Sequence, residues 1–167
     1  MAAHTKTKAD MLTEIMLAIF RVNGRLLEKG DELVAPLHIT SSRWQLLGAI
    51  ALSGRLLTAP QIGEAMGLTR QAVQKQLNKM IDEGLVEQSP NPRHERSPLY
   101  SLTPLGNRTF RRAMQLEGLW SERIVTGLSK EALQCTLRTL NDVFLKLDAP
   151  VPSSKDLARR AVKSRLG

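Results

Sequence analysis

The chain has a single cysteine and no long hydrophobic run, and each absence narrows what the protein can be. Because Cys135 stands alone, the sequence excludes an intramolecular disulfide and any metal site built from several cysteines. The first ten residues are polar, and Glu14, Arg21 and Arg25 interrupt the apolar residues that follow, so neither a signal-peptide core nor a membrane span is present. We therefore expect a soluble protein of the reducing cytoplasm.

Patterns that carry catalysis or bind metals are also missing. The sequence contains no glycine-rich phosphate loop, no nucleophile elbow and no constellation of paired carboxylates. Its three histidines are far apart and lack the spacing of metal ligands. We expect a protein that is not an enzyme and that needs no metal or cofactor.

Basic charge is plentiful, but it is unevenly placed. The chain has 167 residues, 42% of them apolar, and a formal net charge of +8, enough for one hydrophobic core and suited to a polyanionic partner. About half of that net charge lies in the last residues, where one acid faces five bases: Lys155, Arg159, Arg160, Lys163 and Arg165. Residues 69–96 are nearly neutral, so net charge is weak support for any motif there.

Apolar spacing predicts two helices before the centre of the chain. Residues from about Asp10 to Lys29 repeat apolar side chains at helical intervals, so they predict one long amphipathic helix. Gly30 to Pro36 indicates a loop. Ser41 or Ser42 then suits the N-cap of a second helix, which carries Trp44 and is closed by Gly54.

The next segment predicts two short helices joined by a tight turn. Thr58 with Gln61 forms a capping-box pattern, and Gly67 suits the left-handed residue that ends a helix. Thr69 caps the following helix, whose apolar side carries Val73, Leu77, Met80 and Ile81. Its other side is polar and is free to contact a partner: Arg70, Gln71, Gln74, Lys75 and Asn78.

A hairpin and two further helices complete the pattern. Residues 85–88 and 99–102 predict short strands around a charged, proline-containing loop, Ser89 to Pro98. Thr103 and Pro104 start a long helix that reaches Ile124. A last helix begins at Ser129 and carries a heptad seam, which requires a partner helix: Leu133, Leu137, Leu140, Phe144 and Leu147.

This order is that of a winged helix-turn-helix, in which the second short helix enters the major groove of DNA. Arginine can make paired hydrogen bonds to guanine, and glutamine or asparagine to adenine. The helix N-termini around Thr58 and Thr69 offer free backbone amides to phosphates. The alternative is that the polar face is only a solvated helix surface.

The segments that form this pattern resemble those of the MarR family of bacterial transcription regulators. The resemblance rests on residues 57–73, on Gly84-Leu85-Val86 and on residues 91–106, with matching order over roughly Asp10 to Leu147. It implies a single domain over 1–167, mainly α with a small β-hairpin wing. Within it, 41–103 would be the DNA-binding lobe, and 10–35 and 104–147 would supply dimerisation helices. Pro150 and Pro152 end the last helix, and from the composition beyond it we expect 150–167 to be a basic flexible tail.

The resemblance also implies a wing that contacts DNA and a cleft that binds a small phenolic or anionic effector. The candidate wing contacts are Arg93, His94 and Arg96. The wing departs from the family pattern Asp-Pro-x-Asp-Arg-Arg at Asn91, His94 and Glu95. Glu95 or another acid would therefore have to brace the wing arginine. Candidate ligand residues are His38, Trp44 and Arg111. Cys135 lies in the last helix, whereas oxidant-sensing members carry theirs near the first, so we expect a passive thiol.

We therefore expect a homodimeric, sequence-specific repressor that binds a near-palindromic duplex and is released by a small ligand. Three alternatives stay open: a winged-helix protein-interaction module, a nonspecific architectural DNA-binding protein driven by the tail, and, more distantly, a hydrolase. The tail could reach neighbouring phosphates or serve only as a solubilising terminus.

Overall fold

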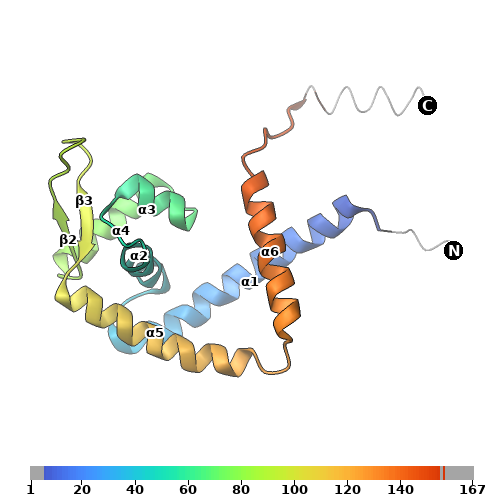
Figure 1. Cartoon of the computed structure of the whole chain (residues 1–167), viewed down its shortest axis with the longest axis horizontal. Coiled ribbons are helices and arrows are strands. Elements are labelled where there is room, and N and C mark those ends of the chain that lie inside the picture. The colour runs from blue at the N-terminus through green and yellow to red at the C-terminus, as the bar shows by residue number, and fades with distance from the viewer. Residues whose placement is uncertain (1–5, 155, 157–167) are drawn as a thin grey trace. The chain divides into compact units, whose positions relative to one another are not determined.

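The computed structural model describes residues 6–154 and 156, so all five basic residues of the predicted tail lie outside the described residues. The chain divides into two compact units, one ending at Ile124 and the other beginning at Val125. The first contains α1 to α5 and all three strands, and the second contains α6 (Figure 1). The fold is mainly helical with a small β-hairpin wing, as the sequence predicts.

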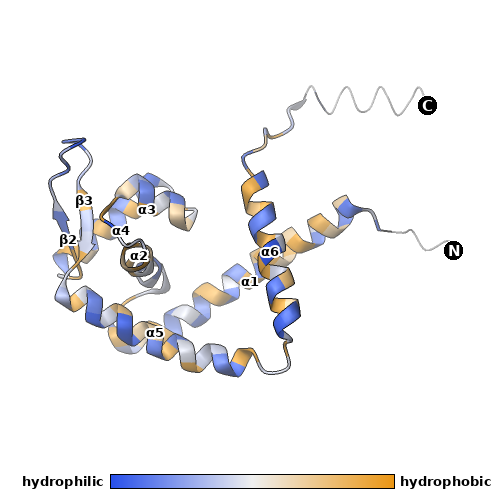
Figure 2. Cartoon of the chain, in the orientation of Figure 1, coloured by the Kyte–Doolittle hydropathy of each residue, from blue (hydrophilic) through white to orange (hydrophobic). Residues whose placement is uncertain are grey.

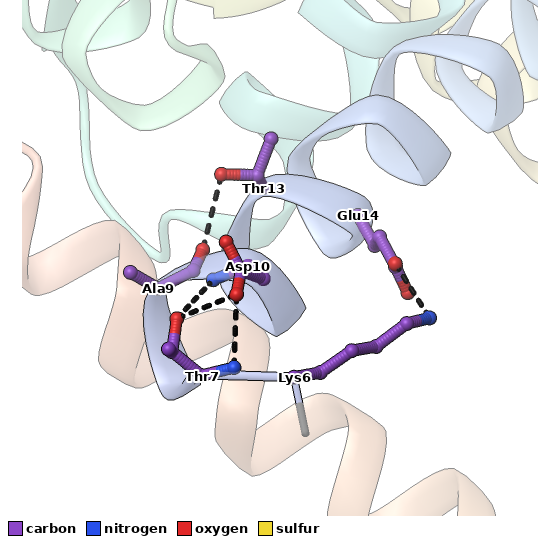
Figure 3. Close-up of polar contacts among 6 residues, drawn as sticks. All are labelled: Lys6, Thr7, Ala9, Asp10, Thr13 and Glu14. Atoms are coloured by element: carbon purple, nitrogen blue, oxygen red, sulfur yellow. Dashed lines mark hydrogen bonds and ion pairs between the residues drawn. The ribbon is translucent and has the colours of Figure 1, made fainter. Parts of the chain in front are cut away.

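The first helix, α1 (Lys8–Val34), begins at a reciprocal cap. The Asp10 amide donates to Thr7 Oγ1 at 3.2 Å, and the Thr7 amide donates to Asp10 Oδ2 at 2.9 Å (Figure 3). The Thr7 amide and the Thr7 hydroxyl both donate to Asp10 Oδ2, and these two hydrogen bonds stabilise the carboxylate and hold the pKa of Asp10 below its usual value. Lys6 and Glu14 form an ion pair of 2.7 Å beside this cap.

The predicted loop from Gly30 to Pro36 is wrong for its first five residues, which continue α1 to Val34. Gly30 is buried within the helix, and a Cβ there would lie 2.6 Å from Ser41 Oγ. Asp31 Oδ1 accepts a hydrogen bond from the Ser41 amide at 2.6 Å. Gly30 therefore serves a close approach of two helices and not a turn.

After the short 3-10 helix η1 (Ala35–Leu37), α2 (Ser41–Leu52) starts one residue earlier than the predicted caps allow. Its N-cap is Thr40, whose Oγ1 accepts from the Arg43 amide at 3.4 Å. Ser41 is buried against Gly30 and is the first residue within the helix. Gly54 has a φ of +66°, as expected of a glycine that closes the helix.

The helix-turn-helix forms as the caps predict. The Thr58 amide donates to Gln61 Oε1 at 2.9 Å to start α3 (Ala59–Met66), and Gly67 ends it with a φ of +63°. Thr69 Oγ1 then accepts from the Ala72 amide at 3.2 Å to start α4 (Arg70–Asp82). Gly63 allows α3 to approach the turn before α4 closely, because a Cβ there would lie 2.7 Å from the Leu68 carbonyl oxygen.

The wing is part of a three-stranded antiparallel sheet in the order β1-β3-β2. The hairpin strands are β2 (Val86–Ser89) and β3 (Leu99–Leu102), close to their predicted positions. The third strand, β1 (Leu57–Thr58), is not predicted by the sequence, since two residues carry no alternation and the strand depends on pairing with β3. Figure 1 shows α2, α3 and α4 gathered beside this sheet.

The hydrophobic core of the first unit lies between these helices and the sheet. The apolar side of α4 is buried as predicted, with Ile81 only partly covered. The largest fully buried side chains come from α1 to α4, β2 and β3: Tyr100, Leu46, Leu47, Ile62, Leu77, Met80, Val34, Val73 and Val86. This core holds α4 and the wing in a fixed position relative to each other.

The wing meets the next helix, α5 (Pro104–Ile124), at a tight junction. Thr103 Oγ1 donates to the Gly84 carbonyl at 2.6 Å and accepts from the Gly106 amide at 3.0 Å. The Thr103 amide donates to the Leu85 carbonyl at 3.1 Å. Gly106 packs directly on Leu85, where a Cβ would overlap its carbonyl oxygen. The two sequence motifs around Gly84 and Gly106 therefore form one joint.

The second unit contains α6 (Lys130–Lys146), capped by Ser129 as predicted. All five apolar residues of its seam are exposed, from 37% at Leu140 to 64% at Leu147. Figure 2 shows apolar residues alternating with polar ones along this helix and along α1. Within the described residues, no helix combines the length and the low polarity that crossing a membrane requires.

Candidate nucleic-acid interface

The polar side of α4 is an exposed surface on a rigid helix. Arg70, Gln71, Lys75 and Asn78 are exposed, while Gln74 is half-buried. Neither Arg70 nor Lys75 forms an ion pair with the part of the chain that the structure describes. Both cations are therefore available to an anionic partner, as the sequence predicts for a helix that contacts DNA.

Gln74 is tied to the wing through a residue that the sequence analysis did not single out. Its Nε2 lies 3.1 Å from the hydroxyl of Tyr100, on β3, and 2.9 Å from Asn78 Oδ1. Gln74 Oε1 lies 3.4 Å from the same hydroxyl. Tyr100 is fully buried, and it is the only tyrosine of the chain, but nothing in its local sequence shows that its hydroxyl reaches α4.

The wing loop is held by Asn91, which stands where the family pattern has its first acid. Its Nδ2 donates to the Ser97 carbonyl at 2.8 Å, and its Oδ1 accepts from the Arg93 amide at 3.0 Å. Among the described residues, Glu95 forms no ion pair with Arg93 or Arg96. The side chain of Asn91 therefore closes the loop from within, and the bracing of a wing arginine by Glu95 or another acid stays a prediction.

A polar cleft of about 420 Å³ joins the wing to the start of α3. It brings together four predicted contact residues, namely Thr58, Gln61, Arg93 and His94. Arg55 lines the cleft as well. The sequence did not predict it as a contact residue, because it precedes β1, a strand that the sequence does not indicate either. Among the described residues, no acid lines this cleft, so its chemistry favours phosphate oxygens. Arg96 is exposed on the same loop but does not line the cleft.

The three predicted ligand residues fall into two different hollows. His38 and Arg111 share a cleft of about 490 Å³ between η1 and α5. Arg108 and Arg112 also line it, and no acid does so within the described part of the chain. Trp44 instead lines an apolar groove of about 460 Å³ with Phe110 and Met114. The structure thus joins two of the three residues at a strongly basic site and separates the third from them.

Cys135 is exposed on α6, with its carbonyl accepting a hydrogen bond from Thr139 Oγ1 at 3.0 Å. The cysteine lies in the second unit, away in sequence from every residue that lines the basic cleft. A passive thiol, the expectation from the sequence, stays a prediction.

Comparison with known proteins agrees with this geometry. The sequence profile of the MarR family matches residues 39–97, which span α2 to the wing. An uncharacterized protein of Mycobacterium tuberculosis is 33% identical over 144 residues, an alignment that covers 86% of this chain and 99% of that protein.

Solved structures share the fold. A mutant MarR of Escherichia coli complexed with operator DNA superposes with a TM-score of 0.70 at 22% identity, covering 83% of this chain and 99% of that one. CouR of Rhodococcus jostii RHA1, bound to p-coumaroyl-CoA, gives a TM-score of 0.69 at 17% identity, with coverages of 83% and 95%. The capped helix pair, the wing and these relatives together show that the chain belongs to the MarR family of winged helix transcription regulators.

Proposed function

We propose that the protein is a cytoplasmic, non-enzymatic repressor that binds a near-palindromic duplex as a homodimer, with one α4 in each of two successive major grooves. The observation that carries the proposal is the polar side of α4, where unpaired Arg70 and Lys75 stand beside Gln71 and Asn78 on an exposed, capped helix. The E. coli structure complexed with operator DNA supports it through the shared fold.

The polar cleft beside the wing would hold the DNA backbone. Arg55 and Arg93, with the start of α3, suit phosphate oxygens, and such contacts fix orientation without reading sequence. Arg96, exposed on the wing loop, can reach into the adjacent minor groove. On this account α4 selects the sequence, and the cleft and wing set the register.

A second copy of the chain is the partner that the exposed apolar residues require. On α1, Met11, Val22 and Leu26 are each at least half exposed, and on α6 the whole seam is exposed. Apolar stripes of this extent normally lie against another helix. In a symmetric dimer the two α4 helices would be related by a twofold axis, so half-site centres would lie about 34 Å apart, one turn of DNA.

The basic cleft under α5 is the proposed effector site. Arg108, Arg111 and Arg112 line it with His38, and Leu37 and Leu105 supply apolar walls. A small anion with an apolar or phenolic body fits this combination, and CouR, of the same fold, is bound to p-coumaroyl-CoA. Such a ligand would release DNA by binding more tightly to a dimer whose recognition helices are wrongly spaced.

Selection of bound duplexes from a random pool tests the function. The proposal expects an inverted repeat with half-site centres separated by about one helical turn. A parallel selection with a chain lacking residues 153–167 should recover the same sequence. Recovery of no consensus by the full chain would refute the proposal, and loss of most affinity in the shortened chain would favour an architectural role for the tail.

A further inference from the structure

Tyr100 lies beneath the DNA-facing side of α4, although it belongs to the wing. It stands in β3, the central strand of the sheet, paired with Leu57 on one side and Gln88 on the other. Its side chain is fully buried. Because the sheet and the core fix the ring, the hydroxyl is held at a constant place against Gln74.

Both N–H donors of the Gln74 side chain are occupied by neighbouring side chains. A glutamine amide has two N–H donors on Nε2 and two lone pairs on Oε1. Nε2 lies 2.9 Å from Asn78 Oδ1 and 3.1 Å from the Tyr100 hydroxyl, so both of its N–H groups have an acceptor. The hydroxyl hydrogen can fill at most one lone pair of Oε1, at 3.4 Å. One acceptor site of Gln74 therefore stays free, and no donor does.

This arrangement changes what α4 can recognise. A glutamine that makes paired bonds to adenine must donate to N7 while it accepts from N6. Gln74 lacks the free donor for that pair. It retains an oxygen, which accepts from an amino group in the major groove, and both adenine and cytosine present one there. Asn78 keeps its own Nδ2 hydrogens for an acceptor, since among the described residues only its Oδ1 is engaged.

We propose that Tyr100 is a specificity-determining positioning residue. By holding the amide of Gln74 together with Asn78, it makes position 74 an acceptor that selects adenine or cytosine and does not distinguish strongly between them. The inference rests on the proposed DNA-binding function and deepens it, because it assigns the base class read at one position of each half-site.

The test uses the site selected by the full-length protein, with each of the four base pairs placed in turn at every position of both half-sites. Affinities are measured by fluorescence anisotropy for the wild type, Tyr100→Phe, Gln74→Glu, and Gln74→Ala with and without Tyr100→Phe. Thermal unfolding of each variant confirms that it is folded. Tyr100→Phe keeps the ring and removes only the hydroxyl.

At one position per half-site, the wild type should bind adenine and cytosine with similar affinity and the other bases at least about fivefold more weakly. Tyr100→Phe frees one N–H of Gln74, so adenine should gain at least about fivefold over cytosine. Gln74→Glu offers oxygen only and should keep the wild-type pattern. With Gln74→Ala, the additional loss of the hydroxyl should change nothing at that position.

Other outcomes overturn the inference in distinguishable ways. If Tyr100→Phe weakens all duplexes equally, the tyrosine has only a structural role. If Gln74→Ala loses a base preference that Tyr100→Phe leaves intact, Gln74 reads DNA without help from the wing, and the proposed function stands. If the wild type shows no base preference at any position, the inference and the proposed function fail together.

Discussion

Replacement of Gly106 by alanine should loosen the joint between the wing and α5. The added Cβ would overlap the Leu85 carbonyl oxygen, which cannot simply rotate away. That oxygen accepts the Thr103 amide at 3.1 Å, and the Leu85 amide itself donates to the Met80 carbonyl at 2.8 Å. The start of α5 must therefore move as a unit, or these hydrogen bonds must lengthen.

The expected cost follows from two opposing effects. Insertion of a methyl group into a packed contact costs up to about 3 kcal/mol, and a backbone obstacle that is itself hydrogen-bonded belongs at the upper end. Alanine recovers about 1 kcal/mol of helix propensity relative to glycine. We expect a net loss of about 2 kcal/mol in the free energy of unfolding, which for a chain of this length lowers Tm by about 4 to 8 °C.

Gly118 provides a matched control in the same helix, because a Cβ there would meet nothing within 4 Å. Gly118→Ala should raise Tm slightly through helix propensity alone. Both variants are compared with the wild type by circular dichroism during thermal unfolding. If Gly106→Ala unfolds at the same temperature as Gly118→Ala, the joint is not tight and the reasoning is refuted.

Three further predictions concern other parts of the chain. Because the pKa of Asp10 is lowered in the folded state, its carboxylate contributes stability that is complete above the unfolded pKa of about 3.9 and is lost as pH falls through the folded pKa. Thr7→Ala removes the hydroxyl of the cap and should raise the NMR titration midpoint of Asp10. An unchanged midpoint would argue against the cap. Leu137→Glu should raise the dimer dissociation constant at least about a hundredfold in sedimentation, because Leu137, exposed in the single chain, would be buried once from each protomer in the proposed dimer. Thr139→Glu, off the seam of the same helix, should leave the constant unchanged. Equal behaviour of the two variants would exclude the seam from the interface. Arg111→Ala should weaken binding of benzoate, a small aromatic anion used as the probe, at least about tenfold by calorimetry through the loss of a charged hydrogen bond. Trp44→Phe, in the separate groove, should not weaken it; the reverse result would move the proposed effector site to that groove.

The local signals of the sequence predict the helix-turn-helix well. Thr58 with Gln61, Gly67 and Thr69 act on backbone groups within a few residues of themselves, so their pattern alone predicts where α3 and α4 begin and end. The winged helix-turn-helix follows from these caps together with the hairpin.

The features that the sequence did not predict depend on contacts between distant segments. Gly30 could serve a turn or a close approach, and only its contact with Ser41 decides between them. The same contact buries Ser41 and leaves Thr40 as the cap of α2, although three hydroxyl residues in succession could each fill that role. At the site, Tyr100 and Arg55 gain their significance from partners on other elements.

If the exposed side of α4 reads DNA sequence, the loss of Arg70 should reduce sequence discrimination. Arg70 is exposed, it starts the helix, and within the described structure it forms no ion pair, so its replacement should leave the fold intact. The measurement is the ratio of affinities for the selected duplex and a scrambled one, for the wild type and Arg70→Ala at one salt concentration. The account predicts that the ratio falls by about tenfold, the effect of losing one paired contact to a base. An unchanged ratio, with both affinities equally reduced, would contradict it.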